Sequence, residues 1–268
     1  MKTMMMSLIC FMCYGKWNFK SAYNTIYQGQ EKSALFKEIV KTVFKDEFPE
    51  DADTLSFLTM SDLNRLTRIL ALKKGEQLAD IACGRGGPGM WVARKTGAAV
   101  RGVDISEEAV AAATRRIPDF GLERRAEFGI GSFYATGLET HGCDGIMSVD
   151  ALWLAPDRNR ALREISRVLK PGGRFAFTTW DGNIPFMPDD HKKNLEDSGF
   201  DIEVYEETRG WKERQLAVYE GIINAKAMLE KEMGKRLAAP IIKEAKSTPP
   251  VLDKSRRIIV GARKRQHR

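Results

Sequence analysis

Residues 78–89 read LADIACGRGGPG, and this stretch decides the fold. It begins as a short apolar run that contains one acid, Asp80, and continues as a segment dense in glycine. Three of the glycines have G-x-G-x-x-G spacing, namely Gly84, Gly86 and Gly89. Glycine adopts positive φ at little cost and lets a ligand approach the backbone closely. Pro88 suits the first turn of a helix and Gly97 suits its end. The stretch therefore predicts a buried strand, a tight turn and a helix.

A second acid follows the next apolar run, residues 98–103. Asp104 comes twenty residues after Gly84, at the end of that run. An acid at the carboxyl end of the second parallel strand can accept hydrogen bonds from ribose hydroxyls. The order of strand, glycine turn, helix, strand and terminal acid therefore indicates a cofactor that carries a nucleoside. The alternative is a plain βαβ unit whose glycines serve only tight packing.

The acid inside the first strand narrows the choice of cofactor. A carboxylate at Asp80, just before the glycine turn, disfavours a pyrophosphate and suits a cation or an amine. S-adenosylmethionine has a sulfonium, an ammonium and a ribose, and no phosphate. Residues 78–89 resemble motif I of the class I S-adenosylmethionine-dependent methyltransferases, and Asp104 resembles their ribose-binding acid. The RVLKPGGR stretch at residues 167–174 is similar to the family's helix-to-strand turn. The resemblance covers roughly residues 55–210 and is strongest to the bacterial small-molecule branch.

The resemblance implies an α/β fold: a doubly wound, seven-stranded Rossmann-like sheet whose last strand is antiparallel. It also implies cofactor contacts, from Tyr27, Asp80, Ala82, Gly84, Arg85, Gly86, Asp104, Ile105, Ser132, Phe133 and Val149. Ser132 stands where the family usually has an aspartate that accepts the adenine amino group, and Phe133 is placed to flank the adenine ring. Tyr27, or else Tyr23, belongs to an expected N-terminal helix that covers the cofactor; plain helix packing is the alternative.

The fourth strand, near residues 144–149, should border the site of the methyl acceptor. The residues at its end, SVDA, differ from the Asp/Asn-Pro-Pro-aromatic motif of enzymes that methylate nucleic-acid amines, and no Pro-Cys dipeptide occurs. Asp150 is either a general base or a structural acid. His191 is the second candidate base, with a surface or capping role as its alternative. Trp153 is either a pocket wall or core. No cluster of metal ligands is seen, so no metal is expected.

Composition and charge fit an ordinary globular protein. Hydrophobic residues make up 43% and charged residues 29% of the 268 positions, and the net charge is +7. Much of the excess falls at the C-terminus, on Lys254, Arg256, Arg257, Arg263, Lys264, Arg265 and Arg268. We interpret these residues as a solvated basic tail, with a nucleic-acid arm as the alternative. The four cysteines are expected to be reduced, with no structural zinc. The apolar run at residues 4–14 is too short to span a bilayer.

Four segments are expected along the chain. Residues 1–18 form a leader that is disordered or packed against a partner, and residues 19–72 form an N-terminal helical lid. The Rossmann-like core comprises residues 73–210 and 254–263. A helical insertion at residues 211–253 forms a cap over the substrate or a dimer surface. In that insertion Trp211 and Tyr219 line the pocket or, alternatively, pack between helices, with Leu216, Tyr219, Ile223 and Ala227 on one helix face.

The hypothesis is methyl transfer from S-adenosylmethionine to an O, N or C nucleophile of a small molecule, such as a metabolite or natural product of secondary metabolism. One alternative is a relative that keeps the cofactor as a scaffold or electrostatic catalyst, for example a cyclase. Others are an RNA-modifying methyltransferase and a nicotinamide oxidoreductase. We expect a cytoplasmic protein with a small-molecule partner, no membrane contact, and a homodimer formed through helical elements; nucleic acid is disfavoured.

Overall fold

The computed structural model describes residues 19–54, 56–182 and 190–266. The expected leader, including Cys10 and Cys13, lies outside these residues. The described chain divides into two compact units. A helical unit combines residues 19–48 with 209–256, and a sheet unit combines residues 49–181, 190–208 and 257–266. No helix of the described residues is both long enough and apolar enough to cross a membrane.

The sheet unit is built on seven strands in the order β3-β2-β1-β4-β5-β7-β6. The strands are β1 (Gln77–Ile81), β2 (Ala99–Asp104), β3 (Ala126–Ile130), β4 (Cys143–Val149), β5 (Leu169–Gly182), β6 (Phe200–Glu207) and β7 (Ser255–Lys264). The neighbours from β3 to β5 run parallel, whereas β7 pairs with β6 in the antiparallel sense. The expected doubly wound sheet with an antiparallel last strand is confirmed.

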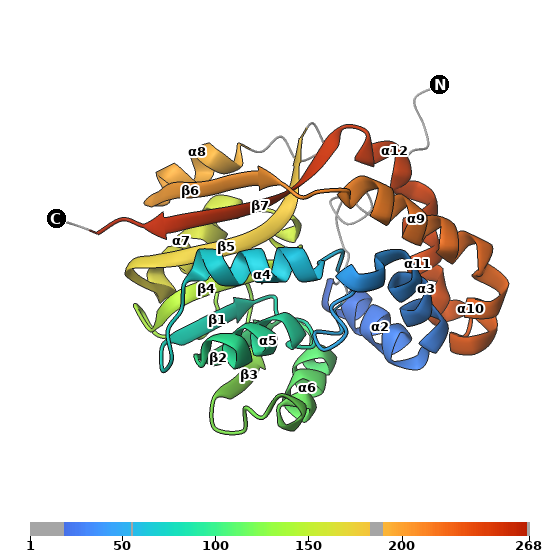
Figure 1. Cartoon of the computed structure of the whole chain (residues 1–268), viewed down its shortest axis with the longest axis horizontal. Coiled ribbons are helices and arrows are strands. Elements are labelled where there is room, and N and C mark those ends of the chain that lie inside the picture. The colour runs from blue at the N-terminus through green and yellow to red at the C-terminus, as the bar shows by residue number, and fades with distance from the viewer. Residues whose placement is uncertain (1–18, 55, 183–189, 267–268) are drawn as a thin grey trace. The chain divides into compact units, whose positions relative to one another are not determined.

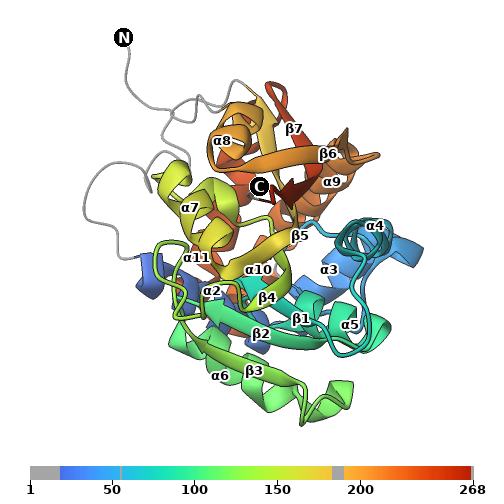
Figure 2. The ribbon, with the colours of Figure 1, turned by 90° about the vertical axis from the view of Figure 1, so that its left-hand side faces the viewer.

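Helices cover both faces of this sheet (Figures 1 and 2). The helices of the unit are α4 (Met60–Leu70), α5 (Gly87–Thr96), α6 (Glu107–Arg116), α7 (Arg158–Val168) and α8 (His191–Asp197). One apolar core joins α4 and α5 to alternate residues of the strands, such as Met147 and Ala176. The other joins α7 to the opposite face, through residues such as Ile146 and Phe177. Strand residues of opposite parity therefore feed two separate cores, as expected for parallel strands buried on both sides.

The C-terminal basic residues do not form a solvated tail, and that expectation is wrong. Arg256, Arg257, Arg263 and Lys264 belong to β7, where Arg257 is fully buried and Lys264 is 5% exposed; Arg268 lies outside the described residues. The Lys264 ammonium donates to the carbonyls of Ser166 and Leu169, and burial lowers its pKa. Two exposed arginines pair with acids of β6, in the ion pairs Arg263–Glu203 and Arg265–Asp201. Strand pairing thus supplies partners that the bare sequence does not reveal.

The helical unit contains α2 (Phe19–Lys32), α3 (Ala34–Phe44), α9 (Trp211–Asn224), α10 (Lys226–Met233), α11 (Lys235–Ser247) and α12 (Pro249–Leu252). The buried face of α9 comprises Trp211, Gln215, Val218, Tyr219 and Ile222. This face differs from the expected one: Ala227 is exposed and lies beyond the end of α9. The polar residue Gln215 lies on the buried face, which a hydrophobic pattern does not predict. Its amide donates to the Tyr219 hydroxyl, which in turn donates to Glu244.

The two units divide the chain differently from the expected segments. The helix α4 was placed in the expected lid, yet it belongs to the sheet unit. Its buried leucines, Leu63, Leu66 and Leu70, pack in the same core as β1 and β4. The helices of residues 19–44 and 211–252 instead pack with each other, α2 against α11 and α3 against α9.

Candidate active site

The sheet brings most of the predicted site residues to one edge. Asp80, Asp104 and Val149 lie at or near the carboxyl ends of β1, β2 and β4, and Ser132 follows the end of β3. These four strands are neighbours and parallel, so their carboxyl ends open on the same side. Ligands of open α/β sheets bind outside this edge, where the direction of strand order reverses. Here the reversal falls between β1 and β4.

The glycine turn (residues 82–86) owes its shape to three left-handed residues. Ala82, Gly84 and Gly86 have φ values of 58°, 53° and 73°. A side chain at Gly86 would also collide with the ring of Phe128, because a Cβ there would lie 2.6 Å from the ring carbon Cζ. Ala82 adopts this conformation despite its methyl group, at a cost of about 1–2 kcal/mol. The turn is therefore a strained, closely packed loop that leads directly into the N-terminus of α5.

Asp104 fastens the glycine turn to the second strand. Its Oδ2 accepts the backbone N–H of Gly84 at 2.8 Å, and its Oδ1 accepts that of Ser106 at 2.9 Å. The carboxylate is 5% exposed, and burial raises its pKa, whereas backbone N–H donors, that of Ile105 included, oppose the rise. A carboxylate has about four acceptor positions. Acceptor capacity therefore remains beyond the backbone bonds, and a ribose hydroxyl can use it.

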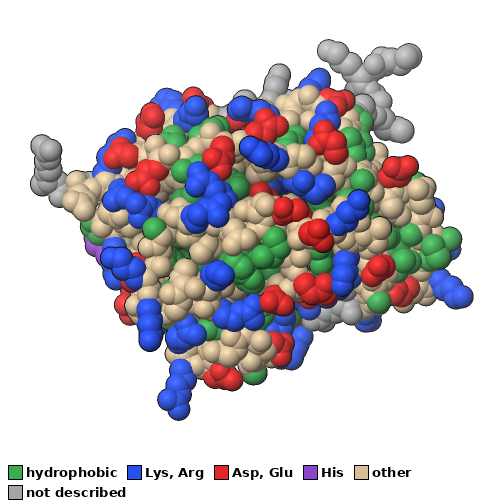
Figure 3. Space-filling model, viewed as in Figure 1, with side chains coloured by type: hydrophobic (Ala, Val, Ile, Leu, Met, Phe, Trp, Pro, Cys, Tyr) green, Lys and Arg blue, Asp and Glu red, His purple; other side chains and the backbone are tan. Residues whose placement is uncertain are grey.

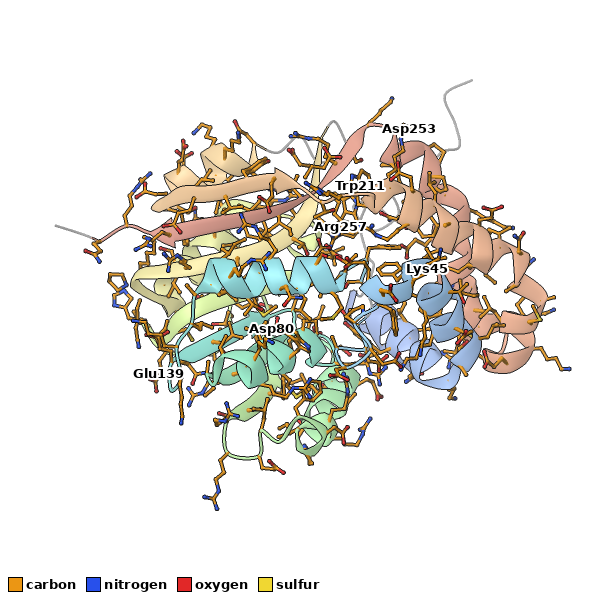
Figure 4. All side chains as sticks on the ribbon, in the orientation of Figure 1. Lys45, Asp80, Glu139, Trp211, Asp253 and Arg257 are labelled. Atoms are coloured by element: carbon orange, nitrogen blue, oxygen red, sulfur yellow. The ribbon has the colours of Figure 1, made fainter. Side chains whose placement is uncertain are left out.

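Asp80 is a buried carboxyl with an unused oxygen. It is 1% exposed, and its Oδ2 has no hydrogen-bond partner among the described residues. Burial raises its pKa to about 7; the backbone N–H of Gly89 opposes this rise and the charge of Asp104 adds to it. Gly89 permits the close approach, because a Cβ there would lie 2.5 Å from Oδ2. Figure 4 labels Asp80 within the sheet unit. A buried acid with one unpartnered oxygen, beside a second acid, fits a cationic ligand.

Four further predicted cofactor residues lie at or just after the carboxyl ends of β2, β3 and β4: Ile105, Ser132, Phe133 and Val149. Ile105, Phe133 and Val149 are half-buried. The Ser132 hydroxyl accepts the backbone N–H groups of Tyr134 and Ala135, each at 3.2 Å, so it shapes the loop after β3. Tyr27 lies in α2 of the helical unit and is half-buried. Its contact with the cofactor stays a prediction.

Asp150 is the centre of a buried ion-pair network. Arg257 Nη2 lies 3.0 Å from Asp150 Oδ2 and Arg257 Nε lies 3.1 Å from Oδ1, which is a two-pronged contact. The second acid is Asp62, whose Oδ2 lies 2.7 Å from Arg257 Nη1. The backbone N–H of Phe57 also donates to Asp150. Burial lowers the pKa of Arg257, but the two acids more than offset this, so the pKa is raised. These contacts favour the structural alternative for Asp150.

Aromatic side chains gather at the ends of β4 and β5. Trp180 meets Phe57 edge-on, with ring centroids 6.3 Å apart, and Trp153 edge-on at 6.0 Å. The Trp153 indole donates to the carbonyl of Asp150, whereas the Trp180 indole N–H is buried without a partner in the described chain. His191, the first residue of α8, is 5% exposed, and its Nε2 lies 3.1 Å from the Trp180 carbonyl oxygen. The rings supply an apolar surface at the acceptor edge.

Several residues of this edge escaped the sequence analysis. Arg257 and Asp62 are 195 residues apart, so no local spacing links them. The one indication in the sequence was the position of Arg257 at the start of an otherwise apolar strand. A charge buried in a strand needs a buried partner of opposite charge. Arg116 and Asp53 also contact the glycine turn, at Arg85. The sequence around these two residues contains no motif that predicts the contact.

Fold and site together define a nucleoside-binding domain with the topology of class I methyltransferases. Residues 79–177 match the methyltransferase domain family, Methyltransf_11. The methyltransferase GfsG of Streptomyces halstedii is 32% identical over 146 residues, which is 52% of each chain. The 27-O-demethylrifamycin SV methyltransferase of Amycolatopsis mediterranei is 32% identical over 47% of each chain. The chain thus spans about half the length of these curated relatives. Residues 79–177 are thus a domain of the methyltransferase family Methyltransf_11.

Solved structures share the fold. The [4+2]-cyclase SpnF superposes with a TM-score of 0.72 at 20% identity, covering 93% of this chain and 96% of that one. The phosphoethanolamine N-methyltransferase 2 of Haemonchus contortus, in complex with S-adenosyl-L-methionine, gives a TM-score of 0.67 at 21% identity, covering 85% of this chain and 56% of that one. At such identities the likeness concerns the fold alone.

The cofactor of this domain is S-adenosylmethionine, and the residues present fit it. The orphaned oxygen of Asp80 and the remaining acceptor capacity of Asp104 match a cation and a ribose. Gly84, which has positive φ and no side chain, lets a ligand approach the backbone of the turn. Among the described residues no group of three or more His, Cys, Asp or Glu is placed to hold a metal ion.

Proposed function

We propose that the protein transfers the methyl group of S-adenosylmethionine to a nucleophilic O, N or C atom of a small molecule. The observation that carries this proposal is the methyltransferase-domain match over residues 79–177, which includes the glycine turn and Asp104. The aromatic cluster at the ends of β4 and β5 supports an acceptor with an apolar body. One relative is named for a rifamycin derivative and others for sterols, so natural-product acceptors of these kinds are the first to test.

We further propose roles for the site residues. The ribose hydroxyls are held by Asp104, the positive end of the cofactor faces Asp80, and the backbone of Ala82, Gly84, Arg85 and Gly86 lies along it. Ile105, Ser132, Phe133 and Val149 surround the adenine, and Tyr27 covers the cofactor. Because the sulfonium already activates the methyl group, alignment of the acceptor supplies most of the acceleration, on the order of 7–11 kcal/mol.

For an O-methylation we keep His191 as the candidate general base and assign Asp150 a positioning role. The Asp150 carboxylate already accepts hydrogen bonds from Arg257 and from the backbone N–H of Phe57. The imidazole of His191 has one nitrogen on the Trp180 carbonyl, which leaves the other for a proton. In this assignment the Asp62–Arg257–Asp150 network fixes the end of β4 beside the acceptor.

The function is tested with methyl-labelled S-adenosylmethionine and three acceptor panels: polyketides including rifamycins, terpenoids including sterols, and sugars with quinones. We expect label in one panel, and loss of that label in the Asp104→Asn variant. If the acceptor is a hydroxyl, His191→Asn should lower kcat. An extract of host metabolites serves as a fourth acceptor sample. If the protein binds S-adenosylhomocysteine but labels neither the three panels nor this extract, methyl transfer is overturned and the non-methylating, cyclase-type alternative is favoured.

The raised pKa of Asp80 predicts a pH-dependent cofactor affinity. Near pH 6 the carboxyl is largely protonated, since its pKa is about 7. A bound cation favours the ionised form, so binding must release a proton below pH 7 and needs no release above it. We expect the Kd for S-adenosylmethionine to fall about tenfold between pH 5.5 and 6.5 and to level off above pH 7.

Calorimetric titration across this pH range measures the effect, and Asp80→Asn is the matched variant because it keeps the shape and cannot ionise. Its Kd should be weaker than that of the wild type at pH 7.5 and flat with pH. A slope that survives in Asp80→Asn would assign the titration to another group.

We propose a cytoplasmic enzyme whose partner is a small molecule, with a homodimer formed through the helical elements. The pairing of Arg263 and Arg265 with acids of β6 supports a protein that has no nucleic-acid partner. On the face shown in Figure 3, Lys and Arg side chains alternate with Asp and Glu rather than gathering in one basic patch. Sedimentation equilibrium tests the dimer, and a filter-binding assay with RNA at two salt concentrations tests the nucleic-acid alternative.

A further inference from the structure

The loop of residues 49–54, which we call the docking loop, lies directly against the glycine turn and the start of α5. Ala52 at its centre is fully buried. The Ala52 carbonyl oxygen occupies the place of a side chain at Gly87: a Cβ there would lie only 1.5 Å from it. Gly87 is the first residue of α5. Gly87 therefore makes room for the docking loop, whereas the glycines before it shape the glycine turn.

One side chain, Arg116 at the end of α6, ties the docking loop to the glycine turn. Its Nη1 donates to the carbonyl of Arg85 at 2.9 Å, between the two left-handed glycines. Its Nη2 donates to the carbonyls of Asp51 at 3.2 Å and Ala52 at 3.3 Å. The guanidinium also lies 5.5 Å from the ring centroid of Phe120. A guanidinium has five donors in a rigid fork, which suits a contact with three carbonyls from two segments.

Arg85 is thereby held at both ends. Arg116 holds its carbonyl, and Asp53 of the docking loop lies 3.2 Å from its guanidinium. Burial lowers the pKa of Arg116; Asp53 opposes this change and Arg85 adds to it. The path of the turn between Gly84 and Gly86 therefore depends on a segment that precedes it by about thirty residues.

We propose that Arg116 is a positioning residue for cofactor binding: it holds the docking loop against the glycine turn, so that cofactor affinity is coupled to docking of the loop. The coupling is reciprocal, and the bound cofactor must in turn stabilise the docked loop. The docking loop begins directly after Phe48, where the chain leaves the helical unit. The docking loop thus acts on the turn through its carbonyl contacts with Arg116 and through the Asp53–Arg85 ion pair.

The test compares Arg116→Gln with Arg94→Gln. Arg94 is the matched control, because it also stacks on Phe120 and contacts the docking loop at Asp51, but it does not touch the glycine turn. Titration with S-adenosylhomocysteine should give a Kd about tenfold weaker for Arg116→Gln and within about twofold of the wild type for Arg94→Gln. Urea unfolding of the unliganded variants shows whether the fold is kept; if Arg116→Gln fails to fold, Arg116→Lys keeps the charge and loses the fork.

Two further measurements separate positioning from general destabilisation. Gly87→Ala displaces the docking loop from the other side, so its effect on Kd should not add to that of Arg116→Gln in the double variant. Amide hydrogen exchange in residues 49–54 should slow when S-adenosylhomocysteine binds to the wild type, and this slowing should be lost in Arg116→Gln. Wild-type affinity in Arg116→Gln, equal losses in both arginine variants, or additive effects with Gly87→Ala would each overturn the proposal.

Discussion

Replacing Arg257 by methionine should lower the free energy of unfolding by about 3–5 kcal/mol. The arginine is fully buried, and its removal leaves the carboxylates of Asp62 and Asp150 enclosed without a cation. Methionine fills much of the volume, so the loss reports the charges rather than a cavity. The loss of Arg257 also weakens two structural contacts of these acids. Asp62 caps α4, and Asp150 accepts the backbone N–H of Phe57.

Urea unfolding followed by tryptophan fluorescence measures this loss. The control is Arg263→Met, which removes an arginine of the same strand from an exposed pair with Glu203 and should cost at most about 1 kcal/mol. Figure 4 labels Arg257, and Arg263 lies farther along β7. A triple variant that combines Arg257→Met with Asp62→Asn and Asp150→Asn should recover part of the stability, because no uncompensated charge is then buried. Equal losses in the two arginine variants would contradict the structural role of the network.

Asp104→Asn should weaken the binding of S-adenosylhomocysteine by about 100-fold or more. The carboxylate accepts the backbone N–H groups of Gly84 and Ser106 and keeps acceptor capacity for the ribose. An asparagine has a single oxygen, so its NH₂ group must face one of these two N–H donors. The variant therefore loses hydroxyl acceptors and disturbs the glycine turn together.

The matched control for this second experiment is Asp144→Asn. Asp144 likewise accepts a backbone N–H, that of Gln77 at 2.8 Å, and it lies at the amino end of β4, at the opposite edge of the sheet. Its replacement should leave the calorimetric Kd within about twofold of the wild type. Wild-type affinity in Asp104→Asn would remove Asp104 from the cofactor site while leaving the domain assignment untouched.

The features that the sequence predicted well are those that depend on neighbouring residues. The glycine turn, the helix after it and the acid at Asp104 fall within thirty residues, so spacing alone orders them. The end of α5 at Gly97 was equally local. The strands β1, β2 and β4 follow from apolar runs that are largely buried.

The features that were missed depend on residues that only the folded chain brings together. One partner of Arg257, Asp62, lies 195 residues away, and Arg263 and Arg265 meet their acids only when β6 lies beside β7. The face of α9 was misjudged because Gln215 is buried and uses its amide within a polar network. The arginines are paired with acids that are distant in sequence, whereas Gln215 donates to Tyr219 one turn along its own helix. In each case a polar residue is buried or paired, although a hydrophobic periodicity predicts it to be free and exposed.

The strand order has a consequence for how the protein is made. Although β7 is the last of the described strands in the chain, it lies between β5 and β6. During synthesis β6 therefore emerges without a neighbour, and the helices of residues 211–252 must be made before its partner appears. Until then β5 and β6 each present an unpaired edge, which invites pairing with another chain. While the ribosome translates residues 211–252, the sheet therefore lacks β7. During this time its unpaired strand edges make the nascent chain most prone to aggregation and most dependent on chaperones.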